Sequence, residues 1–203
     1  MKSRTAKIER KSKETQIITA LTIDGSGKAD IKTPIGILDH MLELFAFHGF
    51  FDLSITVKKA DLNVDIHHAN EDIGIVLGKA FKTALGEDKK GIKRFGFAAA
   101  PMEATLCQCA IDVSGRGYLA IDTGQNTPPI AEQDGYAFNY LEHFLESFAH
   151  TLGATVNIRL SGVSADLHTN LETVFKALGI ALDQATQIDP RRKGVPSTKG
   201  IID

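Results

Sequence analysis

Histidine and glutamate side chains occur together at helical spacing in two places of the 203-residue chain. His67 and Glu71 are four positions apart, and His68 and Glu71 are three apart. His168 and Glu172 are again four apart. Residues at these spacings lie on one face of a helix, so each pair can converge on one point. Imidazole nitrogen with carboxylate oxygen suits manganese, iron or zinc, so these pairs are candidate metal ligands. For a single pair, a surface ion pair or a helix cap is the alternative.

The two histidine–glutamate pairs occupy matched places in an internal repeat. The stretch around His40 resembles the stretch around His143, and both have apolar residues at the i, i+3, i+4, i+7 spacing of a helix. His67 and His168 then open a second helical pattern in each half. Chance should not place histidines at matched positions twice, so the repeat favours two related metal sites over isolated surface pairs.

The elements around these histidines follow the same order in both halves. Residues 22–33 and 112–123 each predict a strand, a Gly-rich turn and a second strand. A helix, an alternating strand and a second helix follow in each half. The pattern predicts an α+β fold of two duplicated units, each a β-sheet backed by two helices.

The boundary between the units is predicted at a polar run with two glycines, near residues 86–93. We therefore expect a first α+β repeat over residues 1–90 and a second over 91–188. Residues 189–203, with two prolines and several basic side chains, are expected to form an irregular tail that contributes to the active site.

Composition excludes several classes of protein. The chain is 43% hydrophobic and 24% charged, and 23 basic against 25 acidic side chains give a net charge of −2. This balance is unlike that of a nucleic-acid-binding protein. Two cysteines, Cys107 and Cys109, offer no disulfide framework and are expected to pack on one face of a strand. No apolar stretch is long enough for a membrane span, and residues 1–13 lack the apolar core of a secretory signal, so we expect a cytoplasmic protein.

Candidate anion-binding residues lie apart from the histidines in the sequence. Arg94 and Arg116 carry guanidinium groups, and Ser197 and Lys199 lie in a Ser-Thr-Lys-Gly stretch. Such groups together can hold a phosphate dianion, although each alone could be a solvated charge. The stretch is not a P-loop, because the leading glycine and the preceding strand are missing. His48 ends a predicted helix, where a plain helix-end histidine is the alternative.

Taken together, these stretches resemble the imidazoleglycerol-phosphate dehydratase family nearly end to end, from Glu14 to Gly200. The most specific stretch is HHANEDIG at residues 67–74. Others lie at residues 38–42, 46–49, 93–96, 112–116, 175–177 and 196–200. The resemblance implies a duplicated α+β unit like the second domain of ribosomal protein S5. It also implies a homo-oligomer of 24 subunits built from trimers, with two manganese ions at subunit interfaces.

The implied enzyme is a carbon–oxygen lyase of histidine biosynthesis. It removes water from D-erythro-imidazole glycerol phosphate to give imidazole acetol phosphate, and it needs no organic cofactor. Its partner is a small-molecule phosphate, with no nucleic acid and no membrane. By similarity, one manganese takes His40, His68, Glu71 and His168. The other takes His67, His143, Glu172 and the residue after His168.

The resemblance also assigns roles on the substrate side. Phosphate binding maps to Arg94, Arg116, Ser197 and Lys199, with His48 and Lys176 nearby. Glu14 matches a glutamate that contacts the substrate. The candidate catalytic carboxylates are Glu172, Glu14 and Glu71. Of these, Glu172 is the first choice to accept the C2 proton and Glu14 the second.

Three positions depart from the family pattern. Thr169 stands where a second histidine is usual, so the second metal site is short of one ligand. Ile66 and Ala104 stand where acidic residues are common. Two alternatives to the dehydratase therefore stay open. One is a metal-dependent hydrolase of a small phosphate ester, and the other is a non-catalytic metal-binding shell protein derived from the dehydratase.

Overall fold

Twelve helices and strands make up the part of the chain that the computed structural model describes, residues 4–125 and 127–202. The first three residues of the N-terminal segment and the last residue of the tail lie outside the described residues. The elements of the first half are β1 (Thr5–Lys11), β2 (Gln16–Thr22), β3 (Ala29–Lys32), α1 (Gly36–His48), β4 (Asp52–Lys59) and α2 (His67–Leu85). Those of the second half are β5 (Phe95–Met102), β6 (Thr105–Asp112), β7 (Tyr118–Asp122), α3 (Phe138–Leu152), β8 (Thr155–Ser161) and α4 (Leu167–Thr186).

The two halves build two sheets with the same topology. The first sheet has the strand order β1-β2-β4-β3, and the second has the order β5-β6-β8-β7. In each sheet three strands are antiparallel, and the short strand after the Gly-rich turn pairs in parallel, β3 with β4 and β7 with β8. The predicted duplicated α+β fold is confirmed.

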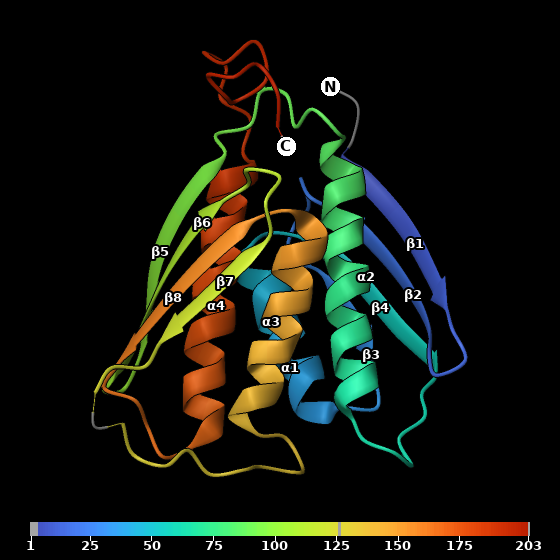
Figure 1. The fold of residues 1–203 in the computed structure, drawn as a ribbon, viewed down its shortest axis with the longest axis vertical. Coiled ribbons are helices and arrows are strands. Elements are labelled where there is room, and N and C mark those ends of the chain that lie inside the picture. Colours follow the sequence, from blue (N-terminus) through green and yellow to red (C-terminus); the bar gives the residue numbers. More distant parts are fainter. Residues whose placement is uncertain (1–3, 126, 203) are drawn as a thin grey trace.

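The four helices lie between the two sheets (Figure 1). α2 packs on β1 and β2, and α4 packs on β5 and β6. The helices also pack across the halves, α2 against α3 and α1 against α4. Phenylalanines from different helices meet edge to face in this layer: Phe45 lies 5.9 Å from Phe81 and 6.4 Å from Phe148, between ring centroids. The repeat predicted each sheet with its helices, and the helix layer joins the two units into one core.

Glycines allow the helices to approach closely, and their contacts show the relative direction of the helices. A methyl group at Gly74 would lie 2.6 Å from the carbonyl oxygen of Phe144, and one at Gly78 would lie 2.7 Å from that of Phe148. A step of four residues along α2, from Gly74 to Gly78, matches a step of four along α3, from Phe144 to Phe148, so these helices run parallel. The repeat-equivalent Gly179 of α4 meets the carbonyl oxygen of Phe45 of α1 in the same way, at 2.6 Å. All four helices begin at the same end of the molecule, the lower end in Figure 1.

The tail lies at the other end of α4. Residues 189–202 form turns and bends, and the described part contains no helix or strand. The amide of Gly91 donates to the carbonyl of Gly194 at 3.1 Å, and the amide of Asp189 donates to the carbonyl of Gly91 at 2.8 Å. The tail therefore folds onto the segment that connects the two halves.

The two cysteines pack as expected. Cys107 and Cys109 are free and fully buried on β6, and burial raises the pKa of both thiols. Among the described residues, no helix is both long and apolar enough to cross a membrane.

Candidate functional site

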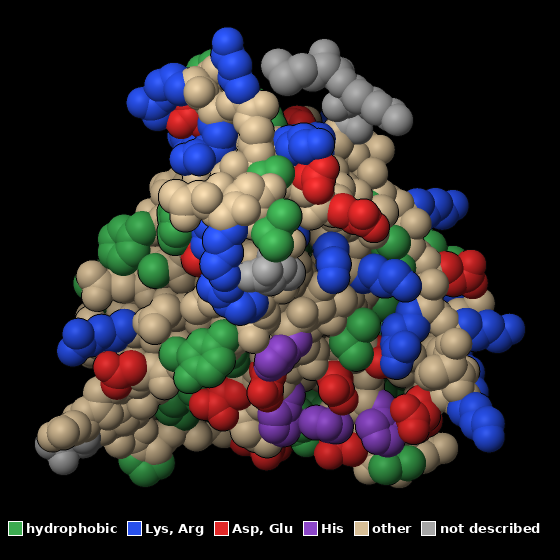
Figure 2. Space-filling view, turned by 45° about the horizontal axis from the view of Figure 1, so that its top comes forward, with side chains coloured by type: hydrophobic (Ala, Val, Ile, Leu, Met, Phe, Trp, Pro, Cys, Tyr) green, Lys and Arg blue, Asp and Glu red, His purple; other side chains and the backbone are tan. Residues whose placement is uncertain are grey.

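The predicted metal-ligating histidines all lie in the first two turns of the helices. His40 is on α1, His67 and His68 open α2, His143 is on α3, and His168 is the second residue of α4. Because the helices run parallel, their first turns meet at one end of the molecule. Figure 2 shows histidine side chains gathered on one face beside aspartates and glutamates.

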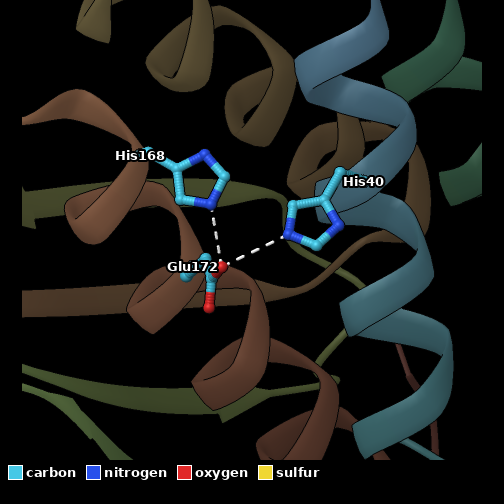
Figure 3. A group of neighbouring side chains, drawn as sticks. All are labelled: His40, His168 and Glu172. Atoms are coloured by element: carbon cyan, nitrogen blue, oxygen red, sulfur yellow. Dashed lines mark hydrogen bonds and ion pairs between the residues drawn. The ribbon is translucent and has the colours of Figure 1, made fainter.

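One cluster joins α1 and α4. The Nε2 atoms of His40 and His168 lie 3.2 Å and 2.9 Å from the same carboxylate oxygen, Oε1 of Glu172 (Figure 3). The two imidazole rings stack with centroids 5.3 Å apart. Two nitrogens and one oxygen therefore converge on one point, a donor set that fits a manganese, iron or zinc ion.

Glu172 is held at both carboxylate oxygens. Its second oxygen, Oε2, pairs with the ammonium of Lys176, one turn further along α4. Burial alone would raise the pKa of Glu172, but hydrogen bonds from Lys176 and the two imidazoles outweigh it and lower the pKa to about 2. Glu172 is therefore ionised at neutral pH, as a metal ligand must be.

A second cluster surrounds the start of α2. One ring nitrogen or carboxylate oxygen from each of Glu14, Asp61 and His68 lies within 4.8 Å of the others. Nδ1 of His68 contacts Oδ2 of Asp61 at 3.2 Å, and this hydrogen bond raises the pKa of His68. The contact leaves Nε2 of His68 as the nitrogen that can bind a metal.

His67 turns towards α3 rather than towards His68. Its Nδ1 lies 3.0 Å from Nδ1 of His143, and its Nε2 lies 3.6 Å from Oε2 of Glu71. Within one chain, the members of each ligand set implied by the resemblance thus lie in two different clusters. His40 and His168 meet as expected, whereas His68 and Glu71 lie with the α2 groups. His67 and His143 also meet as expected, whereas Glu172 lies with His40.

Thr169 makes a different contact from a metal ligand. Its hydroxyl donates to Oδ2 of Asp166 at 2.8 Å, and its amide donates to the same oxygen at 3.1 Å. Asp166 is the N-cap of α4, so Thr169, at the position equivalent to His68 in the repeat, takes part in a helix cap.

Arg94, which directly precedes β5, forms hydrogen bonds beside the C-terminal end of α4. Its guanidinium forms a bidentate pair with Asp112, at 2.6 Å and 2.9 Å, and donates to the carbonyl of Pro196 at 3.0 Å. The amide of Arg94 donates to the carbonyl of Ala185 at 2.8 Å. Seventeen residues separate Ala185 from His168 on α4, and a rise of 1.5 Å per residue puts them about 25 Å apart. Arg94 and the neighbouring Ser197 therefore lie far from this chain's His168.

The other anion-binding candidates divide between the two ends. Lys199 follows Ser197 in the tail, and its amide donates to the Ser197 hydroxyl at 3.2 Å. Arg116 lies in a turn that packs on the end of α3, where the amide of Gly115 donates to the carbonyl of Gly153 at 2.7 Å. His48, the last residue of α1, lies nearer the histidines. Burial lowers its pKa, and the nearby charge of Lys176 lowers it further.

Sequence reasoning missed two residues that shape the site. Asp61 lies seven positions before His68, in a loop where no periodicity points to it. Asn70 is fully buried, accepts a hydrogen bond from the hydroxyl of Tyr136 at 2.9 Å, and donates to the carbonyl of Tyr140 at 2.7 Å. It thereby fixes the start of α2 against the start of α3. An amide at a core-facing position of a helix was the available signal.

Comparisons with known proteins identify the family of the chain. The family model for imidazoleglycerol-phosphate dehydratase matches residues 33–182. Relatives named imidazoleglycerol-phosphate dehydratase include one from a Thermoanaerobacter species, 49% identical over 98% of this chain and 100% of its own length. Another, from Geobacter metallireducens, is 48% identical with the same coverage.

Solved structures give the same result. IGPD from Pyrococcus furiosus superimposes with a TM-score of 0.79 at 36% identity, covering 96% of this chain and 99% of its own. Imidazoleglycerol-phosphate dehydratase from Staphylococcus aureus gives a TM-score of 0.78 at 29% identity, covering 91% and 99%. The resemblance carried by the histidine motifs is confirmed, and the chain belongs to the imidazoleglycerol-phosphate dehydratase family.

Proposed function

We propose that the histidine-rich end of the four helices is where this chain dehydrates imidazole glycerol phosphate in histidine biosynthesis, with manganese as its metal. The single observation that carries this proposal is the convergence of His40, His168 and Glu172 from two helices of different halves. Two imidazoles and a carboxylate that meet at one point form a donor set suited to a transition-metal ion.

The chain offers ligands for two Mn²⁺ ions per subunit. His40, His168 and Glu172 would hold one ion. His68, Glu71, His67 and His143 supply further ligands, and Thr169 leaves this second set one histidine short. Bound manganese would act as a Lewis acid on the imidazole ring of the substrate.

We assign proton abstraction to Glu14 rather than to Glu172. Both oxygens of Glu172 are engaged, Oε1 by the imidazoles of His40 and His168 and Oε2 by the ammonium of Lys176, so neither is free to accept a proton from a substrate. Glu14 lies on the turn between β1 and β2, beside His68 and Asp61. Its carboxylate is well placed to take a proton from a substrate whose imidazole is held at the histidines.

The positions of the phosphate-binding candidates favour a homo-oligomer. Arg94, Ser197 and Lys199 lie at the end of α4 remote from His168, too far to hold the phosphate of a substrate bound to the same chain's histidines. Neighbouring copies would complete each site, so that the tail of one subunit binds the phosphate. Lys176 and His48 would support it from the histidine side. We propose an assembly of 24 subunits built from trimers and, because the pathway is biosynthetic, a cytoplasmic location.

The two alternatives gain no support. The relatives and the solved structures are dehydratases, and a non-catalytic shell would not need Glu14, Lys176 and the tail together.

The test is a dehydratase assay after chelation, with Mn²⁺ titrated back and metal counted per subunit. We expect ketone product to return with manganese and a second ion to bind more weakly than the first. Release of inorganic phosphate in place of the ketone would establish the hydrolase, and no product at any loading would establish the shell protein.

A further inference from the structure

A buried carboxylate on α2 contacts both sides of the hairpin whose turn carries Glu14. Asp72 is only 5% exposed and lies one helical turn after His68. Its Oδ1 pairs with Nη2 of Arg10 at 2.7 Å, and its Oδ2 accepts a hydrogen bond from the hydroxyl of Thr15, which is fully buried. Arg10 is on β1, and Thr15 directly precedes β2. One carboxylate therefore ties both sides of the β1–β2 hairpin to the helix that opens with His67 and His68.

The turn between these anchors is itself ordered. The amide of Ser12 donates to the carbonyl of Thr15 at 2.9 Å, and the hydroxyl of Ser12 accepts from the amide of Glu14 at 3.1 Å. Lys59 of β4 donates to the carbonyl of Lys13 at 2.6 Å. The backbone of Glu14 is therefore fixed relative to Thr15, and Thr15 is fixed relative to α2.

We propose that Asp72 is a positioning residue for the dehydration, which places the carboxylate of Glu14 against the substrate-binding end of α2 through Thr15 and Arg10. The proposal rests on the proton-abstracting role proposed for Glu14. The carboxylate of Asp72 is engaged by Arg10 and Thr15, so its proposed effect is indirect. Its effect is on the distance between two elements that carry reacting groups, and small displacements of such groups slow a reaction strongly.

The second half shows that the fold does not need this arrangement. Thr105 occupies the hairpin position equivalent to Thr15, and it too is buried, but its hydroxyl donates to the carbonyl of Gly162 at 2.8 Å. Thr173 stands where α2 has Asp72, and its hydroxyl donates to the carbonyl of Asn170 in its own helix. A hydroxyl cannot form an ion pair with an arginine. Among the described residues of the two hairpins, the charged pair between hairpin and helix occurs in the hairpin that carries Glu14.

The test compares Thr15→Val with Thr105→Val in the manganese-loaded, full-length protein. Each variant removes one buried hydroxyl from an equivalent hairpin and keeps the side-chain shape. We expect both to lower the melting temperature by a similar amount. We expect Thr15→Val, and not Thr105→Val, to lower kcat, by about 10- to 100-fold with KM changed less than about twofold. Thr15→Ser, which restores the hydroxyl, should recover most of the lost kcat.

Manganese binding separates positioning from metal ligation. The Mn²⁺ affinity of Thr15→Val, measured by the electron paramagnetic resonance of free and bound ion, should equal that of the parent protein. A weakened affinity would make Glu14 a ligand and overturn the proposal. Equal kcat for Thr15→Val and Thr105→Val would also overturn it. Should Thr15→Val not fold, Asp72→Asn, which keeps an acceptor for Thr15 and removes the charge, answers the same questions.

A double-mutant cycle tests whether Asp72 acts through Glu14. If it does, Asp72→Asn should lower kcat in the parent protein and add no further loss in the Glu14→Gln background. Losses that multiply would mean that Asp72 acts independently, which contradicts the proposal. A Glu14→Gln variant with full activity would instead remove Glu14 from its proposed role and leave the hairpin anchor as a structural feature.

Discussion

The starts of α2 and α4 are equivalent in the repeat but differ at one position, where α2 has His68 and α4 has Thr169. α2 opens with His67 and His68, and both imidazoles face other polar groups at the site. At the equivalent positions α4 has His168 and Thr169, and Thr169 is buried against the cap residue Asp166. One position has exchanged a possible metal ligand for a helix cap.

The glutamates that follow have diverged in the opposite direction. The side chain of Glu71 on α2 is 44% exposed and touches one imidazole, whereas that of Glu172 on α4 is 12% exposed and touches two imidazoles and an ammonium. The half that lost a histidine therefore keeps the more tightly held carboxylate. Duplicated metal motifs thus need not remain equivalent, because each ligand also has a structural task in its own half.

Replacing the two glutamates should give the largest difference between the halves. In metal-free protein, Glu172→Gln should lower the free energy of unfolding by about 1–3 kcal/mol, because Lys176 loses its charged partner in a partly buried place. Glu71→Gln should change it by less than about 0.5 kcal/mol. Urea denaturation after chelation measures both, and equal losses would contradict the unequal burial. With manganese present, both variants should lose metal affinity.

Substituting the helix glycines should give equal effects, because the helix contacts are equivalent in the two halves. Gly78→Ala and Gly179→Ala each direct a methyl group at a backbone carbonyl and should destabilise the protein by about 1–3 kcal/mol. Gly36→Ala, where no atom lies within 4 Å, is the control and should not destabilise. Thermal unfolding of the three variants suffices. A cost at only one of Gly78 and Gly179 would show that the two helix pairs are not equivalent.

Restoring the missing histidine should reverse the divergence of α4. Thr169→His should strengthen the binding of the weaker manganese ion while losing about 1 kcal/mol of stability with the hydrogen bond to Asp166. Thr169→Val is the matched control, since it loses the same hydrogen bond and gains no ligand. A manganese isotherm and a melting curve in chelator are needed for each variant. Identical isotherms for the two would exclude position 169 from the metal site.

Acid titration tests the contacts of Glu172 through the pH dependence of stability. The pKa of Glu172 falls from its usual 4.5 to about 2 in the folded, metal-free protein. Its contribution to stability is therefore complete above about pH 4.5 and is lost as the pH falls towards 2. The urea midpoint of Glu172→Gln should vary less with pH across this range than that of Glu71→Gln. Parallel curves would mean that the contacts of Glu172 do not stabilise the folded state.

Much of the fold followed from the repeat, because periodicity is a local property. The helices that begin at His67 and near His168 and the Gly-rich turns were predicted at their places. The contact of α2 with α3 and of α1 with α4 was not predicted. Gly78 and Gly179 occupy matched positions of the repeat, but the sequence does not show which helix each glycine contacts.

The sequence predicted which residue types form the candidate site better than it predicted which of those residues lie together. Helical spacing placed His168 with Glu172, but the approach of His40 to the same oxygen depends on the packing of α1 on α4. Asp61 and Asp72 contact residues of other helices and strands, and spacing along the chain does not predict such contacts. The distance between His168 and the tail could have been foreseen, since a helix of 20 residues separates its ends by about 30 Å.

The parallel course of the four helices has an electrostatic consequence. Each helix start carries about half an elementary charge of positive sign from its aligned peptide dipoles, so four starts at one end sum to about two. A divalent cation is repelled by this field and an anionic substrate is attracted to it. Four carboxylates lie at this end, those of Glu14, Asp61, Glu71 and Glu172, and their negative charge offsets the positive charge of the helix starts. Removing any one of these carboxylates is therefore expected to make this end of the molecule more attractive to anions.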